Sequence, residues 1–120
     1  MNSRKKGCRG ELECAHYLTD RGFPARRTQQ YCGTEGNSDV TCEALGEYHL
    51  EVKRTERLQL REAMEQAVRD SQGKVPIVVH RGNRTPWLVV MRLDDWLADV
   101  QAKLGAQEDA AFRDPLRDGL

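Results

Sequence analysis

The sequence predicts one α/β domain in which a mixed β-sheet of about five strands is flanked by helices. The chain has 120 residues, a length that suits a single domain with one core. Segments of helical periodicity stand near both ends and near the middle, and short segments rich in β-branched residues lie between them. The resulting order α-β-β-β-α-β-β-α, with a helix crossing between strands, is typical of a mixed sheet covered by helices.

The first helix is expected over about residues 7–21, where Leu12 and Leu18 belong to an apolar stripe and Gly22 provides a stop. A short strand is expected over residues 23–27, and the polar residues 28–38 predict a loop. A basic arm that precedes the helix contains Arg4, Lys5, Lys6 and Arg9.

The central part predicts a hairpin of strands over residues 39–43 and 47–54, followed by a second helix over about residues 58–71. The apolar stripe of this helix is expected to contain Leu60, Met64, Ala67 and Val68.

The last part predicts two strands, over residues 75–80 and 87–91, whose nearly continuous apolar runs are typical of strands covered on both faces. Asp94 is expected to cap a final helix that ends near Leu104 and closes the domain over residues 1–104. Residues 105–120 predict a flexible acidic tail. The residues of the final helix that we expect to face inward are Trp96, Leu97, Val100 and Leu104.

The net charge of zero hides an uneven distribution. From Asp94 onward the chain has seven acidic and three basic residues, which leaves 16 basic and 12 acidic residues before it. A basic front part is compatible with a phosphate-rich partner, although scattered solvated charge explains it equally well. The four cysteines lack the close spacing of a zinc site, and neither a signal peptide nor a transmembrane run is visible, so we expect reduced thiols and a cytoplasmic, intracellular protein.

The predicted hairpin brings two carboxylates together. A three-residue loop over residues 44–46, with Gly46 in the left-handed conformation, would place Asp39 opposite Glu51. The same register pairs Val40 with Leu50 and Cys42 with Tyr48 on the other face.

Two adjacent carboxylates repel each other, and a divalent cation with oxygen ligands such as Mg²⁺ would offset the repulsion. Lys53 points to the same face as Glu51 because side chains alternate along a strand. Glu11 lies on the apolar stripe of the first helix and could reach the same cluster. The alternative is an ordinary solvated ladder of charges, which a Glu-x-Lys pattern usually represents.

These residues resemble the PD-(D/E)XK nuclease superfamily, and within it the small archaeal and phage Holliday-junction resolvases. The resemblance covers roughly residues 6–97, and Ser38 replaces the usual proline before the first catalytic aspartate. The segments that carry it are Glu11, Ser38-Asp39-Val40, Leu50-Glu51-Val52-Lys53-Arg54-Thr55 and Gln66-Ala67.

The resemblance implies a restriction-endonuclease-like fold and a metal-dependent DNA endonuclease. It implies Mg²⁺, or Mn²⁺ in its place, held by Asp39, Glu51 and the backbone carbonyl of Val52, with Glu11 completing the site. It places Lys53 beside the attacking water. It further implies a homodimer, because a symmetric four-way DNA junction needs two cuts, and a phage-encoded protein is compatible with it.

Three further assignments concern Gln66, the two tryptophans and the basic residues. Gln66 is either a supporting polar residue near the metal or a plain surface glutamine. Trp87 and Trp96 are expected in the core rather than as base-stacking platforms. The candidates for DNA phosphate contacts are Arg4, Lys5, Lys6, Arg9, Arg26, Arg27, Arg54 and Arg57, each of which could equally be an ordinary solvated base.

Three functions therefore compete. The first is a resolvase of four-way junctions, and the second is a nuclease of the same chemistry that acts on flaps, nicks or a restriction-like duplex site. The third is a non-catalytic DNA-binding module. The third is disfavoured because a pure binder gains nothing from carboxylates that face phosphate.

Overall fold

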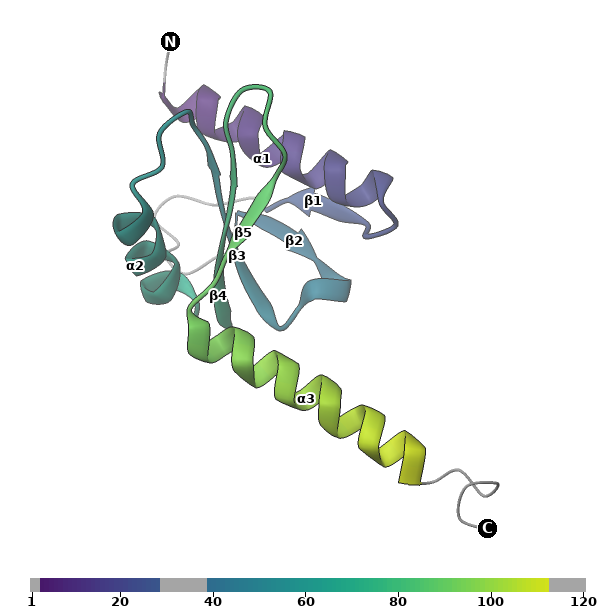
Figure 1. The fold of residues 1–120 in the computed structure, drawn as a ribbon. Helices are drawn as coiled ribbons and strands as arrows, with labels where there is room; N and C mark the ends of the chain where they lie inside the picture. Colours follow the sequence, from purple (N-terminus) through teal and green to yellow (C-terminus); the bar gives the residue numbers. More distant parts are fainter. Residues whose placement is uncertain (1–2, 29–38, 113–120) are drawn as a thin grey trace.

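The computed structural model describes residues 3–28 and 39–112, with side chains from 6 to 109 within these ranges. The elements follow the predicted order, so the predicted α/β architecture is confirmed (Figure 1). They are α1 (Ser3–Asp20), β1 (Ala25–Arg27), β2 (Val40–Cys42), β3 (Tyr48–Arg54), α2 (Leu60–Asp70), β4 (Val75–Arg81), β5 (Leu88–Val90) and α3 (Leu93–Phe112), with a single 3₁₀ turn over Glu43–Leu45.

The five strands form two small sheets rather than one continuous sheet. β4 lies between β3, to which it is parallel, and β5, to which it is antiparallel. The parallel pairing follows from the crossover through α2, because two strands joined by a helix can run in the same direction. β1 and β2 form a separate antiparallel pair. Asp39 connects the two sheets, since its carbonyl accepts from Thr28 N–H and its own N–H donates to Leu50 O.

α1 and α2 cover opposite faces of the β3–β4 pair (Figure 1). Leu50 and Val52 of β3 pack with Cys14 and Ala15 of α1 in the main core. Val78 of β4 packs with Ala63 and Ala67 of α2 in a second, smaller core. Because side chains alternate along β3, Glu51, which lies between Leu50 and Val52, points toward α2.

The two amphipathic helices differ in part from the prediction. α1 already begins at Ser3, so residues 4–6 and Arg9 belong to the helix rather than to a preceding arm. In α2 the buried residues are Ala63 and Ala67, whereas Leu60 and Val68 are 49% and 38% exposed. The predicted stripe was therefore wrong at Leu60 and Val68. The small side chains of Ala63 and Ala67 let α2 lie close to the sheet, and its larger side chains turn outward.

β5 and α3 differ most from the prediction. Val89 and Trp96 are 60% and 53% exposed, so neither the double coverage of β5 nor the core position of Trp96 is correct. Trp87, in contrast, packs against the main core as expected. α3 also continues past Gly105 to Phe112, where the sequence predicts a tail. The sequence does carry an apolar pattern here, but nothing in the described part of the chain covers it.

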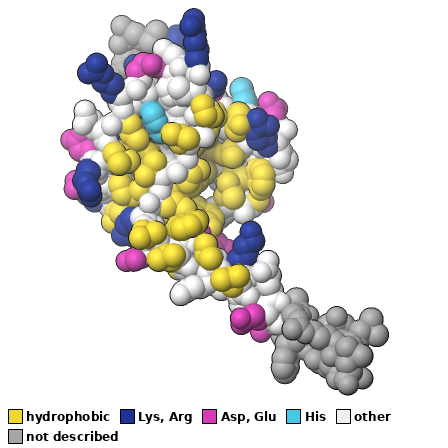
Figure 2. Space-filling view, viewed as in Figure 1, with side chains coloured by type: hydrophobic (Ala, Val, Ile, Leu, Met, Phe, Trp, Pro, Cys, Tyr) yellow, Lys and Arg dark blue, Asp and Glu magenta, His cyan; other side chains and the backbone are white. Residues whose placement is uncertain are grey.

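We call this exposed surface the β5–α3 face. Figure 2 shows hydrophobic side chains gathered over β5 and along the adjoining part of α3. Tyr48 Oη donates to Asp99 Oδ2 at 2.8 Å, which fixes the first half of α3 against the body. The residues of the face are Leu88, Val89, Leu93, Trp96, Leu97 and Leu104.

Three other predictions concern the loop, the cysteines and membrane-crossing helices. The predicted loop falls largely outside the described residues, since only Thr28 at its start is placed. Cys8, Cys14 and Cys42 are free thiols in the described part of the chain. Within the same part, no helix combines the length and hydrophobicity that crossing a bilayer requires.

Candidate active site

Asp39 lies directly before β2, and the predicted hairpin does not position it. Residues 43–45 form a 3₁₀ turn, and Gly46 has φ −64°, a right-handed conformation, so the predicted left-handed glycine is wrong. β2 pairs with β1 instead of forming a ladder with β3, which removes the predicted pairing of Cys42 with Tyr48. Next to β2, Asp39 forms a backbone hydrogen bond to β3, since its N–H donates to Leu50 O.

Asp39 nevertheless lies beside Glu51, as the sequence predicts. Its Oδ2 accepts the backbone N–H of Val52 at 2.9 Å, immediately after Glu51. Burial, and then the nearby charge of Glu51, raise the pKa of Asp39 from 3.8 to about 8. The carboxylate pair is thus an electrostatically strained arrangement, which a cation would relieve.

Lys53 extends the same face of β3 and contacts α2. Its Nζ lies 3.9 Å from Glu51 Oε2 and donates to Gln66 Oε1 at 2.9 Å. Gln66 is half-buried on the face of α2 that also carries Ala63 and Ala67. The structure therefore brings Gln66 to the lysine and disfavours the plain surface glutamine.

Glu11 lies near the pair but has a partner of its own. Its Oε2 accepts from Arg27 Nε at 2.6 Å. The charge of Glu11 also contributes to the raised pKa of Asp39, so the two carboxylates lie on the same side of the domain. A direct role of Glu11 in metal binding would require it to share or release Arg27.

The oxygen atoms of the candidate site suit a hard divalent cation. Asp39 Oδ2 accepts from Val52, Glu51 Oε1 lies beside His49 and Glu51 Oε2 lies near Lys53. An ionised carboxylate offers about four lone-pair sites, so these contacts still leave room for an ion. In an extended strand the N–H and C=O of one residue point to the same side, so the Val52 carbonyl faces Asp39 as its N–H does. Carboxylate and carbonyl oxygens are the ligands that Mg²⁺ and Mn²⁺ prefer.

Among the predicted phosphate contacts, Arg27 and Arg54 form ion pairs inside the domain. Arg54 Nε donates to Glu13 at 3.0 Å, and Glu13 also binds Arg81 Nη1 at 2.5 Å. Arg27 is held by Glu11. The structure thus assigns Arg27 and Arg54 to contacts between elements rather than to open cationic surface. The side chains of Arg4 and Lys5 lie outside the described residues, whereas those of Lys6, Arg9, Arg26 and Arg57 are exposed.

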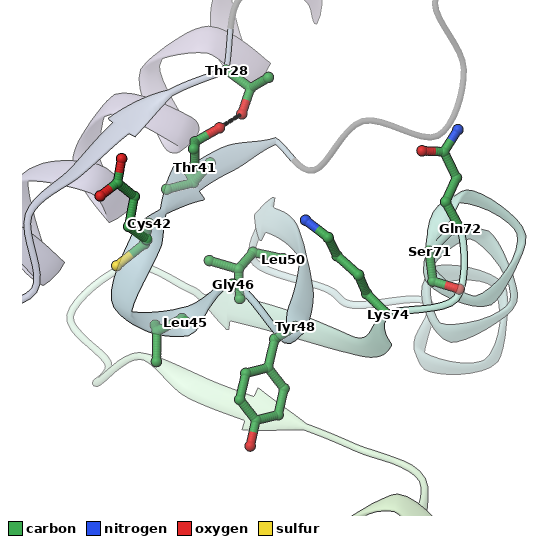
Figure 3. Close-up of a pocket in the computed structure, with 12 residues that line it drawn as sticks. Thr28, Thr41, Cys42, Leu45, Gly46, Tyr48, Leu50, Ser71, Gln72 and Lys74 are labelled. Carbon is green, nitrogen blue, oxygen red and sulfur yellow. Dashed lines mark hydrogen bonds between the residues drawn. The ribbon is translucent and has the colours of Figure 1, made fainter.

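A depression of about 330 Å³ opens beside Lys53 and Gln66. Arg57 and Arg69 line it together with Glu62, so cations outnumber acids among its described residues. A second depression, of about 420 Å³, lies between β2 and the start of β3 (Figure 3). Thr28 and Thr41 are hydrogen-bonded there, and Lys74 extends into it. None of the candidate catalytic residues is among those that line the second depression in the described chain.

Comparison with known proteins identifies the family of the chain. Residues 2–112 match the protein family described as "Phage putative PDDEXK endonuclease". The chain belongs to this family. It is therefore an endonuclease of the PD-(D/E)XK type, and Asp39, Glu51 and Lys53 stand in the order that gives the type its name.

Among solved structures, the chain is similar to Hjc, a Holliday junction resolvase from the archaeal hyperthermophile Archaeoglobus fulgidus. The match has 21% identity and a TM-score of 0.49, and it covers 69% of this chain and 74% of Hjc. At this identity and TM-score, the likeness carries no information about substrate. No curated protein matches the chain significantly.

The sequence interpretation missed one residue of the candidate site. His49 precedes Glu51 by two positions, so it faces α2 with Glu51 and Lys53, and its Nε2 lies 3.0 Å from Glu51 Oε1. The alternation was visible in the sequence, but a histidine inside a strand is common enough that spacing alone did not single it out.

Proposed function

We propose that this PD-(D/E)XK endonuclease hydrolyses DNA with Mg²⁺ or Mn²⁺ and that its substrate is a four-way junction. The observation that carries the hydrolytic part is the convergence of Asp39 and Glu51 beside Lys53. The junction substrate is supported by the sequence resemblance to small resolvases. An intracellular location is part of the same proposal, because the substrate is DNA.

The residues of the chain divide the chemistry among them. A bound divalent cation would polarise the scissile phosphodiester and lower the pKa of a coordinated water. Asp39, Glu51 and the Val52 carbonyl would hold this ion, since the Asp39 carboxylate is hydrogen-bonded to the backbone of Val52, directly after Glu51. Lys53, steadied by Gln66, would orient the attacking water or stabilise the negative charge that develops on the phosphate.

Cleavage of a synthetic four-way junction, with and without Mg²⁺, tests the hydrolytic proposal. We expect paired nicks only with the metal, and a loss of about 10²-fold or more in rate for Asp39→Asn and for Lys53→Ala. Lys103→Ala, which removes an exposed lysine on α3, serves as the control and should cleave like the wild type. Cleavage by Lys53→Ala at the control rate would overturn the proposal.

Competition between a junction and a linear duplex of equal length tests the substrate. A resolvase should cleave the labelled junction in the presence of an excess of duplex. Equal inhibition by duplex and by unlabelled junction would instead favour the alternative, a PD-(D/E)XK endonuclease that acts on other DNA.

We also propose that the protein is a homodimer that forms through the β5–α3 face. Two cuts in a symmetric junction need two related sites, which a dimer with a twofold axis provides. β5 is an edge strand with exposed apolar side chains, and the stripe on α3 continues the same surface. A second copy of the chain offers a matching apolar surface, whereas DNA does not.

A further inference from the structure

The least exposed polar side chain of the described core is His49. It is 1% exposed, and Glu51 is 3% exposed. The His49 Nε2 atom lies 3.0 Å from Glu51 Oε1. A buried imidazole that contacts a buried carboxylate is expensive to place unless both groups are satisfied, so the pair calls for an explanation beyond packing.

α2 contributes a third group to this pair. Asp70 follows Gln66 by one helical turn, so both side chains leave α2 on the same face. Ligand-type atoms of Asp70, His49 and Glu51 all lie within 4.8 Å of one another. β3 and α2 therefore approach each other at two places. At one, Lys53 donates a hydrogen bond to Gln66, and at the other, Asp70 lies close to His49 and Glu51.

The hydrogen bond constrains the direction of the Glu51 carboxylate. An ionised Glu51 only accepts hydrogen bonds, so the proton must lie on His49 Nε2. A glutamate has three rotatable side-chain bonds, and anchoring Oε1 on His49 removes most of this freedom. Oε2 is then directed toward Lys53, which lies 3.9 Å from it. A carboxylate oxygen of Asp70 lies within 4.8 Å of ligand-type atoms of both His49 and Glu51, so its negative charge acts on the same imidazole.

We propose that His49, supported by Asp70, is a positioning residue that holds Glu51 in the orientation needed to bind the divalent cation. This inference rests on the proposed function, because it presumes that Glu51 is a metal ligand. His49 itself stays outside the ligand set. Hydrogen-bonded partners of metal ligands commonly change metal affinity by 10–100-fold when they are removed.

Two substitutions separate the hydrogen bond from the imidazole ring. His49→Leu fills the buried space without a donor, and His49→Gln keeps an N–H near the position of Nε2. We expect His49→Leu to weaken Mg²⁺ binding, measured by calorimetric titration, about 10–100-fold and His49→Gln to weaken it less than about 3-fold. His16→Leu, which removes an exposed histidine of α1, should bind Mg²⁺ like the wild type.

A second readout separates positioning from a general loss of structure. The Mg²⁺ concentration for half-maximal cleavage should rise in His49→Leu by the same factor as the dissociation constant, while the rate at saturating Mg²⁺ stays within about 3-fold of wild type. Unchanged affinity in His49→Leu would overturn the inference. So would equal losses in His49→Gln and His49→Leu, which would instead make the imidazole a ligand.

Should His49→Leu not fold, Asp70→Asn provides the test, because it removes the supporting charge at a half-buried position. We expect it to weaken Mg²⁺ binding about 3–10-fold, and unchanged affinity would overturn the role of Asp70. Failure of the proposed function is recognised separately. A wild-type protein that binds Mg²⁺ but cleaves no DNA would refute the nuclease activity and leave the effect of His49 on metal affinity measurable.

Discussion

Gln66 tests whether the placement of Lys53 matters beyond its charge. Its Oε1 accepts from Lys53 Nζ at 2.9 Å, so Gln66→Ala keeps the charge of Lys53 but removes the hydrogen bond that positions its ammonium group. We expect the cleavage rate at saturating Mg²⁺ to fall about 10-fold with little change in stability. Gln101→Ala, on the exposed surface of α3, is the matched control. A Gln66→Ala rate equal to that of the control would show that the contact has no role in the reaction.

The raised pKa of Asp39 predicts how the free energy of unfolding depends on pH in the absence of metal. Its pKa is raised from 3.8 to about 8 by burial and by Glu51, so the folded protein keeps a proton that the unfolded chain has lost. The free energy of unfolding therefore falls as pH rises from about 4 to about 8, since the unfolded chain binds fewer protons there. Asp39→Asn removes this penalty, and its Tm at pH 8 in EDTA should exceed that of wild type by roughly 5 °C.

The advantage of Asp39→Asn should disappear near pH 4, where wild-type Asp39 is protonated in both states. Saturating Mg²⁺ should also reverse it, because the ion stabilises only the carboxylate. Asp20→Asn, at an exposed position of α1, controls for the loss of one acidic charge. A Tm difference between Asp39→Asn and wild type that is the same at pH 4 and pH 8 would contradict the electrostatic explanation.

At the scale of elements, α1 and β3 approach each other through a glycine. A Cβ at Gly10 would lie 2.6 Å from Arg54 Cβ, whereas one at Gly7 would meet nothing within 4 Å. Gly10→Ala should therefore lower the free energy of unfolding by about 1–3 kcal/mol. Gly7→Ala, three residues earlier in the same helix, should leave it unchanged or raise it by up to about 1 kcal/mol. Urea denaturation of both variants measures the difference, and equal effects would show that the helix can shift away from β3.

The sequence identified the elements better than their connections. The order of helices and strands follows from local periodicity, which a single segment carries by itself. The turn at Gly46 was wrong because a glycine permits a left-handed conformation without requiring one. Asp39 still reached Glu51, since its backbone bonds to Leu50 and its side chain bonds to Val52 independently of the turn.

At the scale of the molecule, the sequence could not say what covers an apolar stripe. Trp96 and Leu97 have the spacing of a core-facing helix, and that spacing is the same whether the covering surface belongs to the same chain or to another. The described chain leaves both residues exposed, at 53% and 43%. The error in placing Trp96 in the core is therefore itself an argument for a partner.

The proposed dimer can be tested on the same tryptophan. Trp96→Glu places a charge in the β5–α3 face, and burying it in an apolar interface without a partner would be costly. We expect a dimer at micromolar concentration by analytical ultracentrifugation, with the dissociation constant raised at least about 10-fold in the variant. Leu60→Glu makes a comparable change at an exposed position on α2, where Leu60 is 49% exposed, and should leave the dimer intact. A monomeric wild type, or equal weakening in both variants, would refute dimerisation through this face. If Trp96→Glu is monomeric and still folded, it should nick one strand of a junction without the paired second cut, because Asp39, Glu51 and Lys53 all belong to one chain.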